Sequence, residues 1–329
     1  MRLLYISSGK KTLSDLNPNM IHAFKQLEKK SDRFRFASFL LLRQPVKKLI
    51  KKIRSFQPDI ILVFGHDNHV VFPHLKNIGV PVGLWVVNDP YNLSNYDWKA
   101  RLYDFVITQE SSCVSYYQKM GKPCIHSPLA ADPRKYRPMN VPAKYRSDIC
   151  FVGNGWPARV DFFNRLTPFL RRKQFILIGE RWNRLTQYQK MKSHILKTTI
   201  PPSETAKYYN GAKIVLNIHR SYNDGNKNPL NLPAHTPNNR TFDIAACRAF
   251  QLLDYRRDLG RFYKIGEEIV CFKGMNDLKK KIDYYLIHEA ERKKIASRSY
   301  HRTLKEHSYT ARLRILLEEL ETHVVKRNR

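Results

Sequence analysis

The chain has 329 residues, of which 42% are hydrophobic and 12% aromatic; this composition excludes a disordered protein, and the length predicts two globular domains of ordinary size. Its 59 basic and 28 acidic residues give a net charge of +31. A positive field of that size favours anionic partners, namely nucleotide phosphates, acidic polymers, anionic lipid or nucleic acid.

Apolar residues occur in short runs, and none approaches the eighteen residues that a membrane-spanning helix requires, so we expect no transmembrane segment. The opening run Leu3–Ile6 is too short for the core of a secretory signal and predicts a buried strand. Five scattered cysteines without a CxxC pair predict a reducing, cytoplasmic compartment and no zinc cluster or disulfide scaffold.

Strand patterns alternate with helix patterns in the first part of the chain. Strands are expected at Leu3–Ser8, Phe34–Leu42, Asp59–Gly65, Val80–Val87, Phe105–Thr108 and Cys124–His126. Helices are expected at Asn19–Lys30 and Val46–Phe56. This alternation implies an α/β fold with a parallel, doubly wound sheet, whose ligands lie beyond the carboxyl ends of the strands.

Four prolines between Pro128 and Pro142 predict an interdomain linker, after which the pattern restarts. Strands are expected at Ser147–Val152, Phe175–Ile178, Ile214–Ile218, Gln251–Asp254 and Ile269–Phe272. Helices are expected at Ala158–Leu170, Arg240–Arg248, Asn276–His288, Glu289–Glu306 and Ala311–Val325. We therefore expect Rossmann-like domains over 1–137 and 138–310 that face a cleft, and a C-terminal helix and basic tail over 311–329 that cross back to the first domain.

The most informative segment is Asn238–Cys247, in which polar residues precede an apolar-periodic stretch. The free N–H groups and the dipole of such a helix start favour a phosphate, and Arg240 adds a guanidinium suited to phosphate oxygens. Thr241 belongs to the same first turn. Asp243 lies on the same face as Arg240, where it either accepts hydrogen bonds from ribose hydroxyls or forms a surface ion pair.

Two glycine-containing loops follow strands of the second domain. Gly153-Asn154-Gly155 forms a tight loop that permits close backbone approach to a phosphate or a sugar. Gly179 and Glu180 repeat this geometry and offer a polar edge to a base, while Trp182 either stacks on the base or caps a core.

Three further residues follow the same pattern of strand ends and loops. Ile200 is held extended by the prolines that follow it, so its backbone either pairs with a base edge or belongs to a plain loop. His219 and Arg220 end a strand and form either a second phosphate clamp or a solvated pair.

Asp89 and His66 follow strands of the first domain and are candidates for the general base that deprotonates an acceptor hydroxyl. Asp89 before Pro90 is equally a good turn former, and a histidine at a strand end is often structural. Glu110 is a weaker candidate. The helix Val46–Phe56 carries five basic residues and either covers the sheet or lies on anionic lipid.

Several blocks of the second domain occur together in one known family. They are Asn217–Arg220, Asn239–Cys247, Phe250–Tyr255, Gly266–Phe272, Asp283–Leu286 and Glu306–Tyr309. In these blocks the chain resembles the CgeB-like spore-maturation glycosyltransferases. The resemblance implies a GT-B fold, transfer of a sugar from a nucleotide-diphosphate sugar, with a pyrimidine base expected, and an acceptor on the side of the first domain. It also implies a spore-forming bacterium and a place in the mother-cell cytoplasm or the spore surface layers.

The resemblance also carries individual residues. Asp243 occupies the place of a ribose-binding Glu of the wider GT-B group, and His235 occupies the place of a second Glu near the donor sugar in many retaining members. The departure at His235 leaves retention or inversion open. Arg248 stands where a Gly is usual, so that it either narrows the donor pocket or contacts a phosphate. GT-B enzymes typically need no metal, and we expect no metal or other cofactor here.

Charge bears on the acceptor and on two competing functions. Residues 1–137 hold 22 basic and 10 acidic residues and the remainder holds 37 and 18, so the surplus is not an appended tail. We expect an anionic acceptor, such as a glycan, a wall polymer or a lipid-linked intermediate. The alternatives are a catalytically inert nucleotide- or glycan-binding relative, which the missing acid at His235 favours, and a nucleic-acid-binding protein, which only the charge favours.

Overall fold

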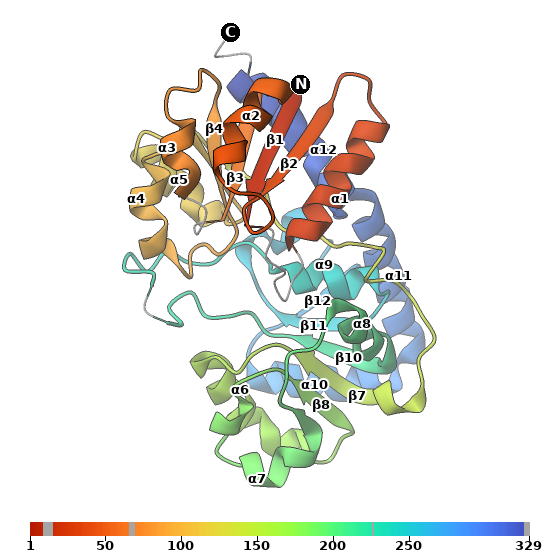
Figure 1. Ribbon diagram of the computed structural model, residues 1–329. Coiled ribbons are helices and arrows are strands. Elements are labelled where there is room, and N and C mark those ends of the chain that lie inside the picture. The colour runs from red at the N-terminus through yellow and green to blue at the C-terminus, as the bar shows by residue number, and fades with distance from the viewer. Residues whose placement is uncertain (9–15, 66–69, 226, 326–329) are drawn as a thin grey trace. The chain divides into compact units, whose positions relative to one another are not determined.

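The computed structural model describes residues 1–8, 16–65, 70–225 and 227–325, which form two compact units with one parallel sheet each (Figure 1). The first unit comprises residues 1–129, 225–236 and 309–329, and the second comprises 130–224 and 237–308. The first crossing therefore follows residue 129, earlier than the expected boundary at residue 137. The sequence pattern also did not indicate the short return of 225–236 to the first unit.

The sheet of the first unit has the strand order β2-β1-β3-β4-β5-β6, and every neighbouring pair is parallel. Its strands are β1 (Arg2–Ser7), β2 (Arg35–Leu40), β3 (Ile60–Phe64), β4 (Val82–Val86), β5 (Phe105–Thr108) and β6 (Cys124–His126). Its helices are α1 (Leu16–Lys29), α2 (Lys47–Phe56), α3 (Phe72–Leu75), α4 (Asp97–Ala100), α5 (Val114–Lys119) and α12 (Tyr309–Leu320).

Both faces of the first sheet are covered, which explains why its strands are continuously apolar. Leu4 and Ile6 of β1 pack in the same cluster as Leu49 and Ile53 of α2. Tyr5 points to the opposite face, where its ring lies 6.0 Å from the ring of Phe24 on α1. Side chains alternate across a strand, so one strand supplies both layers of the core.

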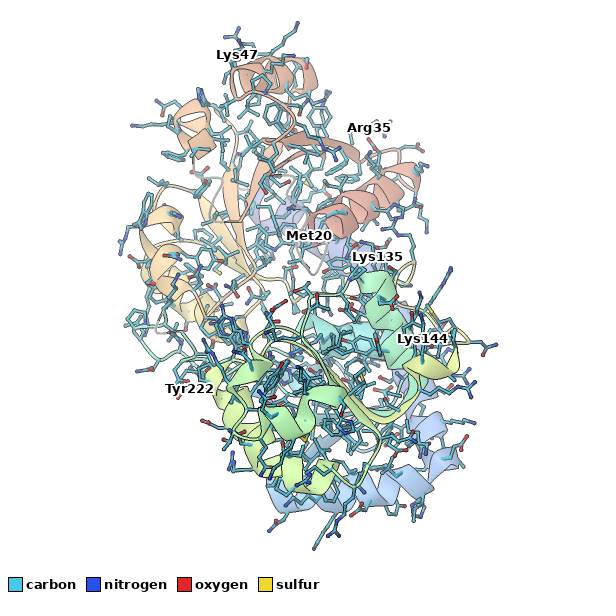
Figure 2. The ribbon with its side chains drawn as sticks, turned by 60° about the horizontal axis from the view of Figure 1, so that its bottom comes forward. Met20, Arg35, Lys47, Lys135, Lys144 and Tyr222 are labelled. Carbon is cyan, nitrogen blue, oxygen red and sulfur yellow. The ribbon has the colours of Figure 1, made fainter. Side chains whose placement is uncertain are left out.

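The helices of the first unit bury one face against the sheet and expose the other face to solvent. Met20 of α1 is buried, whereas Lys47 at the start of α2 is exposed (Figure 2). The C-terminal helix α12 packs beside α1, as the sequence predicted for the returning tail helix (Figure 1). After α12 the chain forms a single π-helical turn, η8 (Glu321–Val325).

The sheet of the second unit has the strand order β12-β11-β10-β7-β8-β9 and is also parallel throughout. Its strands are β7 (Ser147–Val152), β8 (Phe175–Ile178), β9 (Ile195–Leu196), β10 (Ala212–Asn217), β11 (Gln251–Asp254) and β12 (Val270–Phe272). Its helices are α6 (Pro157–Leu170), α7 (Tyr188–Met191), α8 (Pro202–Gly211), α9 (Asn239–Ala246), α10 (Met275–Ile287) and α11 (Glu289–Glu306).

Strand β10 is central and contributes to two cores. Ile214 and Leu216 pack in one cluster with Phe163 of α6, while Val215 packs in the other with Phe242 of α9. The fold class expected from the sequence, an α/β protein with two Rossmann-like doubly wound units, is confirmed. The carboxyl ends of β7, β8, β10 and β11 lie along one edge of the second sheet, because all its strands run in the same direction.

Candidate functional site

The loops that follow β7 and β8 touch backbone to backbone at the carboxyl edge of the second sheet. A Cβ added to Gly179 would lie 2.3 Å from the carbonyl oxygen of Gly153, so no other residue fits there without displacement. The Gly155 N–H donates to the Glu180 carbonyl at 2.9 Å, and the Glu180 N–H donates to Oδ1 of Asn154 at 3.0 Å. These contacts bring together all five residues that the sequence predicted in the two loops.

Helix α9 begins at the same edge and is capped by a side chain. Oδ1 of Asn238 accepts the N–H of Thr241 at 3.0 Å, which satisfies one of the donors that a helix start leaves open. The cap is tied to β10 because Nδ2 of Asn238 donates to Asn217, which in turn donates to Oγ1 of buried Thr241. The predicted helix start is therefore held in register with the sheet.

Arg240 lies between the ends of β7 and β10. Its Nη1 donates to the Val152 carbonyl and its Nη2 to the Ile218 carbonyl at 3.2 Å, and its guanidinium lies 5.4 Å from the Phe151 ring. A Cβ at Gly153 would lie 2.2 Å from Nη1. Gly153 thus lets the guanidinium reach the strand ends, and these hydrogen bonds fix its orientation.

A second guanidinium, that of Arg159, lies at the same strand ends and was not predicted from the sequence. Arg159 of α6 is buried, and its Nε donates to the same Ile218 carbonyl at 3.0 Å while its Nη1 donates to the Asn154 carbonyl at 3.1 Å. The available signal was the helical pattern: Arg159 occupies the apolar stripe of Phe163, Leu166 and Leu170. A cation on a buried stripe needs partners and marks a polar site.

His219 is buried at the end of β10 and forms a pair with Asp254 of β11. Its Nδ1 and its backbone N–H both lie 2.8 Å from Oδ1 of Asp254. Burial lowers the pKa of His219 to about 4, although Asp254 opposes this shift, so the imidazole is neutral at pH 7. The nearby positive charge of Arg256 also lowers this pKa. The predicted phosphate clamp therefore cannot act through a histidine charge.

The neutral imidazole has a defined hydrogen-bonding role. Because the Asp254 carboxylate accepts from Nδ1, the remaining Nε2 of His219 carries a lone pair. This Nε2 is buried and has no hydrogen-bond partner within the described part of the chain. His219 can consequently accept a hydrogen bond from a hydroxyl group and cannot donate one to a phosphate from Nε2.

The two tryptophans near the site have opposite roles. Trp182 is fully buried and donates from Nε1 to the Gly153 carbonyl at 2.9 Å, so it caps the core and offers no stacking face to a base. Trp156, which the sequence analysis did not single out, is partly exposed between two guanidiniums. Its ring lies 4.4 Å from the guanidinium of Arg181 and 3.9 Å from that of Arg220. Such stacking orients both cations.

Asp243 lies on the buried face of α9, where its Oδ2 accepts from Nδ2 of Asn239 at 3.0 Å. Burial raises the pKa of this carboxyl well above its ordinary value. Ile200 is half-buried just before α8. Arg248 is exposed, follows the C-cap residue of α9 with φ +55° and donates to Ser297. This left-handed conformation is one that Gly adopts more readily than Arg.

His235 belongs to the first unit, where its backbone binds a buried carboxyl. Oε1 of Glu110 accepts the N–H groups of His235 at 2.9 Å and of Thr236 and Ser112 at 3.2 Å. Burial raises the pKa of Glu110 to about 7, although these N–H groups lower it. Glu110 thus anchors the segment 225–236, a role that the sequence analysis did not assign to it.

Asp89 is fully buried in the first unit. Its Oδ2 accepts from Oγ1 of Thr108 at 2.7 Å and from the hydroxyl of Tyr117 at 3.0 Å. Burial raises the pKa of Asp89 to about 6, against these two hydrogen bonds. This enclosure favours a positioning role over direct contact with an acceptor. The other predicted base, His66, lies outside the described residues.

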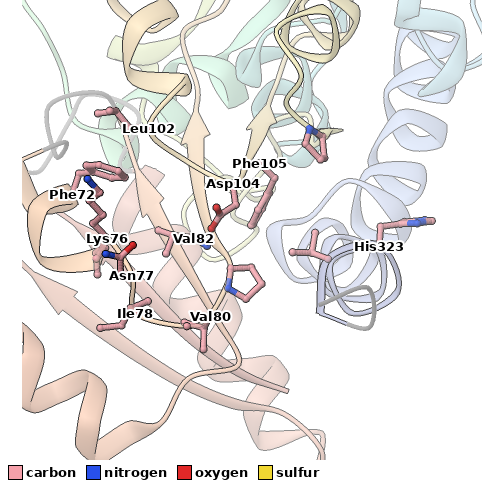
Figure 3. Close-up of a pocket in the computed structure, with 15 residues that line it drawn as sticks. Phe72, Lys76, Asn77, Ile78, Val80, Val82, Leu102, Asp104, Phe105 and His323 are labelled. Carbon is pink, nitrogen blue, oxygen red and sulfur yellow. Dashed lines mark hydrogen bonds between the residues drawn. The ribbon is translucent and has the colours of Figure 1, made fainter. Parts of the chain in front are cut away.

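A cavity of about 630 Å³ lies at the amino ends of strands β4 and β5 in the first sheet (Figure 3). It is lined by the segments that precede β4 and β5 and by His323 and Val324 of η8. Ligands of doubly wound sheets lie beyond the carboxyl ends of strands, so this amino-end cavity is not assigned to the site.

Neither metal-binding nor membrane-spanning features occur in the described ranges. No three His, Cys, Asp or Glu side chains gather there as metal ligands. None of the helices seen in those ranges combines the length and the apolar character needed to cross a bilayer.

Solved structures share this two-sheet fold over nearly the whole chain. Sucrose-phosphate synthase of Thermosynechococcus elongatus is 11% identical, with a TM-score of 0.65 over 98% of this chain and 99% of that one. HepE of Anabaena, in complex with UDP and glucose, is 12% identical, with a TM-score of 0.63 over 98% and 100%. A glycosyltransferase of Rickettsia africae is 13% identical, with a TM-score of 0.64 over 98% and 99%. The likeness defines the fold as that of the GT-B glycosyltransferases.

Sequence comparison places the chain within this class. Residues 143–318 match the glycosyl transferase-like family model. The chain is also 30% identical over 313 residues to Spore protein CgeB of Bacillus subtilis (strain 168), covering 92% of this chain and 94% of that protein. The chain belongs to the glycosyl transferase-like family and is a glycosyltransferase. The resemblance seen in the sequence is confirmed.

The buried Glu110 predicts a specific pH dependence of stability. Its pKa is higher in the folded than in the unfolded protein, so its contribution is fully present below about pH 4 and is lost as the pH rises through 7. Between pH 4 and 7 the free energy of unfolding should fall by about 2–3 kcal/mol more in the wild type than in Glu110→Gln, measured by urea titration.

A matched control for Glu110 is available in the same unit. Glu318 lies exposed on α12, and Glu318→Gln should keep the pH dependence of the wild type. If the free energy of unfolding of Glu110→Gln fell between pH 4 and 7 as much as that of the wild type, a group other than Glu110 would cause the pH dependence.

Proposed function

We propose that the second unit binds a nucleotide-diphosphate sugar and that the protein transfers its sugar to an acceptor. The observation that carries this proposal is the convergence of two guanidiniums, those of Arg159 and Arg240, with the capped start of α9 beyond the strand ends. Helix starts and fixed guanidiniums bind phosphates through complementary charge and N–H donors. HepE, which shares the fold, was solved with UDP and glucose, and this supports a donor whose nucleotide carries a pyrimidine base.

Each residue near the edge receives a role in this proposal. The loops at Gly153–Gly155 and Gly179–Glu180 let the donor approach the backbone. Asn239 and Arg240 at the start of α9 bind the diphosphate, and Thr241 contributes by holding this helix start in register. Basic groups and the helix end stabilise the leaving diphosphate because they are oriented before the reaction, so we propose that no metal is required.

Other donor contacts follow from hydrogen-bonding capacity. Neutral His219 accepts a donor hydroxyl, and Arg220 contributes charge beside it. The backbone of Ile200 pairs with the base, and Asp243 binds the ribose after exchanging its contact with Asn239. His235, which belongs to the first unit, is kept as a sugar-binding candidate on the resemblance alone. Its imidazole replaces a carboxylate of the wider group, so a glycosyltransferase-like binding protein without turnover is the second candidate, and donor hydrolysis at excess protein separates the two.

The acceptor is proposed to be anionic, because a net charge of +31 exceeds what one diphosphate requires. A surface glycan, a wall polymer or a lipid-linked intermediate fits this charge. The relative in Bacillus subtilis is a spore protein, which supports action in the mother-cell cytoplasm or at the spore surface. The general base for the acceptor hydroxyl is proposed to be His66, with Asp89 as the alternative although its enclosure favours a positioning role.

Arg240→Ala tests the phosphate role. The substitution should weaken binding of UDP by about 10–100-fold, the range that corresponds to a lost charge-assisted hydrogen bond, and calorimetry measures this affinity. Arg171→Ala is the control: it removes an exposed guanidinium at the C-terminal end of α6 and should leave the affinity for UDP unchanged. Equal affinities of Arg240→Ala and the wild type would remove Arg240 from the site. A thermal-shift screen of nucleoside diphosphates identifies the base.

Asp89→Asn and His66→Gln separate a base from a positioning group. Loss of the base should lower turnover by about 10²–10⁴-fold while UDP affinity and the melting temperature hold. For Asp89 we expect the melting temperature to fall together with turnover, because two buried hydroxyl groups lose their charged acceptor. A stable, UDP-binding but inactive Asp89→Asn protein would instead make Asp89 the base.

Salt tests the anionic acceptor. The Debye length falls from about 10 Å at 0.1 M to about 3 Å at 1 M, so dispersed surface charges are screened more strongly than close contacts. Binding of a phosphate-bearing polymer, with polyphosphate as the probe, should weaken much more than binding of UDP. Parallel losses of the two affinities would contradict an extended anionic partner.

A further inference from the structure

Helix α2 turns a basic face outward from the first unit. Leu49 and Ile53 are its buried residues. Lys47, Lys48 and Lys51 are exposed (Figure 2 labels Lys47). Arg54 is exposed as well. Packing against the sheet accounts for the inner face of α2 and leaves the composition of the outer face to be explained.

The basic residues of this face lower the stability of helix α2. Lys47 and Lys48 occupy the first turn, where the helix dipole favours acidic residues, and no acidic residue is present there. Lys47 and Lys51, and likewise Lys48 and Lys52, form like-charge i,i+4 pairs, which are also unfavourable. A helix that served only to cover the sheet would be more stable with acids at these positions. Local conflicts of this kind are expected where a surface has a function.

The surrounding sequence does not neutralise the charge. No acidic residue occurs between Asp32 and Asp59, a stretch with eight basic residues. These residues are Arg33, Arg35, Arg43, Lys47, Lys48, Lys51, Lys52 and Arg54. The sequence around α2 therefore carries a local surplus of positive charge, and an external anionic surface would relieve its self-repulsion.

An exposed apolar residue precedes the cations of α2 in the chain, five residues before Lys47. Leu42, in the turn between β2 and α2, is 71% exposed and is followed by exposed Arg43. A leucine gains nothing from a dissolved polyanion, whereas at a bilayer it enters the boundary between headgroups and acyl chains while neighbouring cations bind anionic headgroups. The combination favours a lipid surface over an acidic polymer.

We propose that Leu42 and the basic face of α2 dock the first unit on an anionic lipid bilayer. This docking goes beyond the proposed transfer reaction and does not depend on it, because α2 contributes no residue to the proposed donor site. It places the chemistry at a membrane surface, where a lipid-linked or surface-bound acceptor is reached in two dimensions.

Vesicle sedimentation of the full-length protein tests the charge. The wild type should bind vesicles of phosphatidylcholine with 30% phosphatidylglycerol and not bind phosphatidylcholine alone. Each basic residue at an anionic surface contributes about fivefold, so the triple variant Lys47→Ser, Lys48→Ser, Lys51→Ser should bind about 100-fold more weakly. Lys273→Ser, Lys280→Ser, Lys294→Ser removes the same charge from exposed sites of the second unit and should bind as the wild type does. Equal losses in the two triple variants would overturn the proposal.

Leu42→Ser distinguishes lipid from polyanion. It should weaken vesicle binding by about fivefold and leave polyphosphate binding unchanged, because only the bilayer offers an apolar phase. Unchanged vesicle binding by Leu42→Ser, together with loss in the triple lysine variant, would show a polyanion surface and overturn the lipid proposal. Lys47→Glu with Lys48→Glu should raise the melting temperature while abolishing vesicle binding. A lower melting temperature would instead assign these lysines to the fold.

Discussion

The carboxyl edge of the second sheet depends on a close approach of two backbones. Gly153 and Gly179 meet where a Cβ on Gly179 would lie 2.3 Å from the facing carbonyl oxygen, and Arg240 crosses Gly153 where a Cβ would lie 2.2 Å from Nη1. A side chain is excluded at Gly179 by the facing backbone, and a side chain at Gly153 would displace the Arg240 guanidinium, so the contact of the two loops and the position of Arg240 depend on both glycines. The diphosphate contacts that we propose for Asn239 and Arg240 start from this arrangement.

Electrostatics at this edge follows from burial. The Ile218 carbonyl accepts from both Arg159 and Arg240, so two cations share one backbone acceptor. The next residue, His219, is neutral because burial lowers its pKa to about 4. The edge therefore combines fixed positive charge with a neutral acceptor of hydroxyl groups, and this combination suits a sugar joined to a diphosphate.

Burial has a different consequence in the first unit. Asp89 and Glu110 are carboxyls whose pKa values rise to about 6 and about 7 because they are removed from water. Both bind neighbouring groups, so they organise loops beyond the strands. Helix α2 shows the opposite pattern, with repelling lysines kept at the surface. The lysines reduce the stability of helix α2 but give it a basic outer face, and the proposed docking on anionic lipid accounts for their presence.

The sequence by itself determined the described strands except the short β9, together with the fold class and the start of α9. Phe105–Thr108, Phe175–Ile178 and Gln251–Asp254 were predicted with the observed bounds, because strands buried on both faces are continuous apolar runs between polar loops. Only the tertiary structure decided that Glu110 anchors His235 and Thr236, more than a hundred residues away, and that the segment 225–236 returns to the first unit. It also decided which carboxyls are buried. Periodicity reports which face of an element is apolar, whereas a hydrogen bond between distant segments depends on packing that no local pattern encodes.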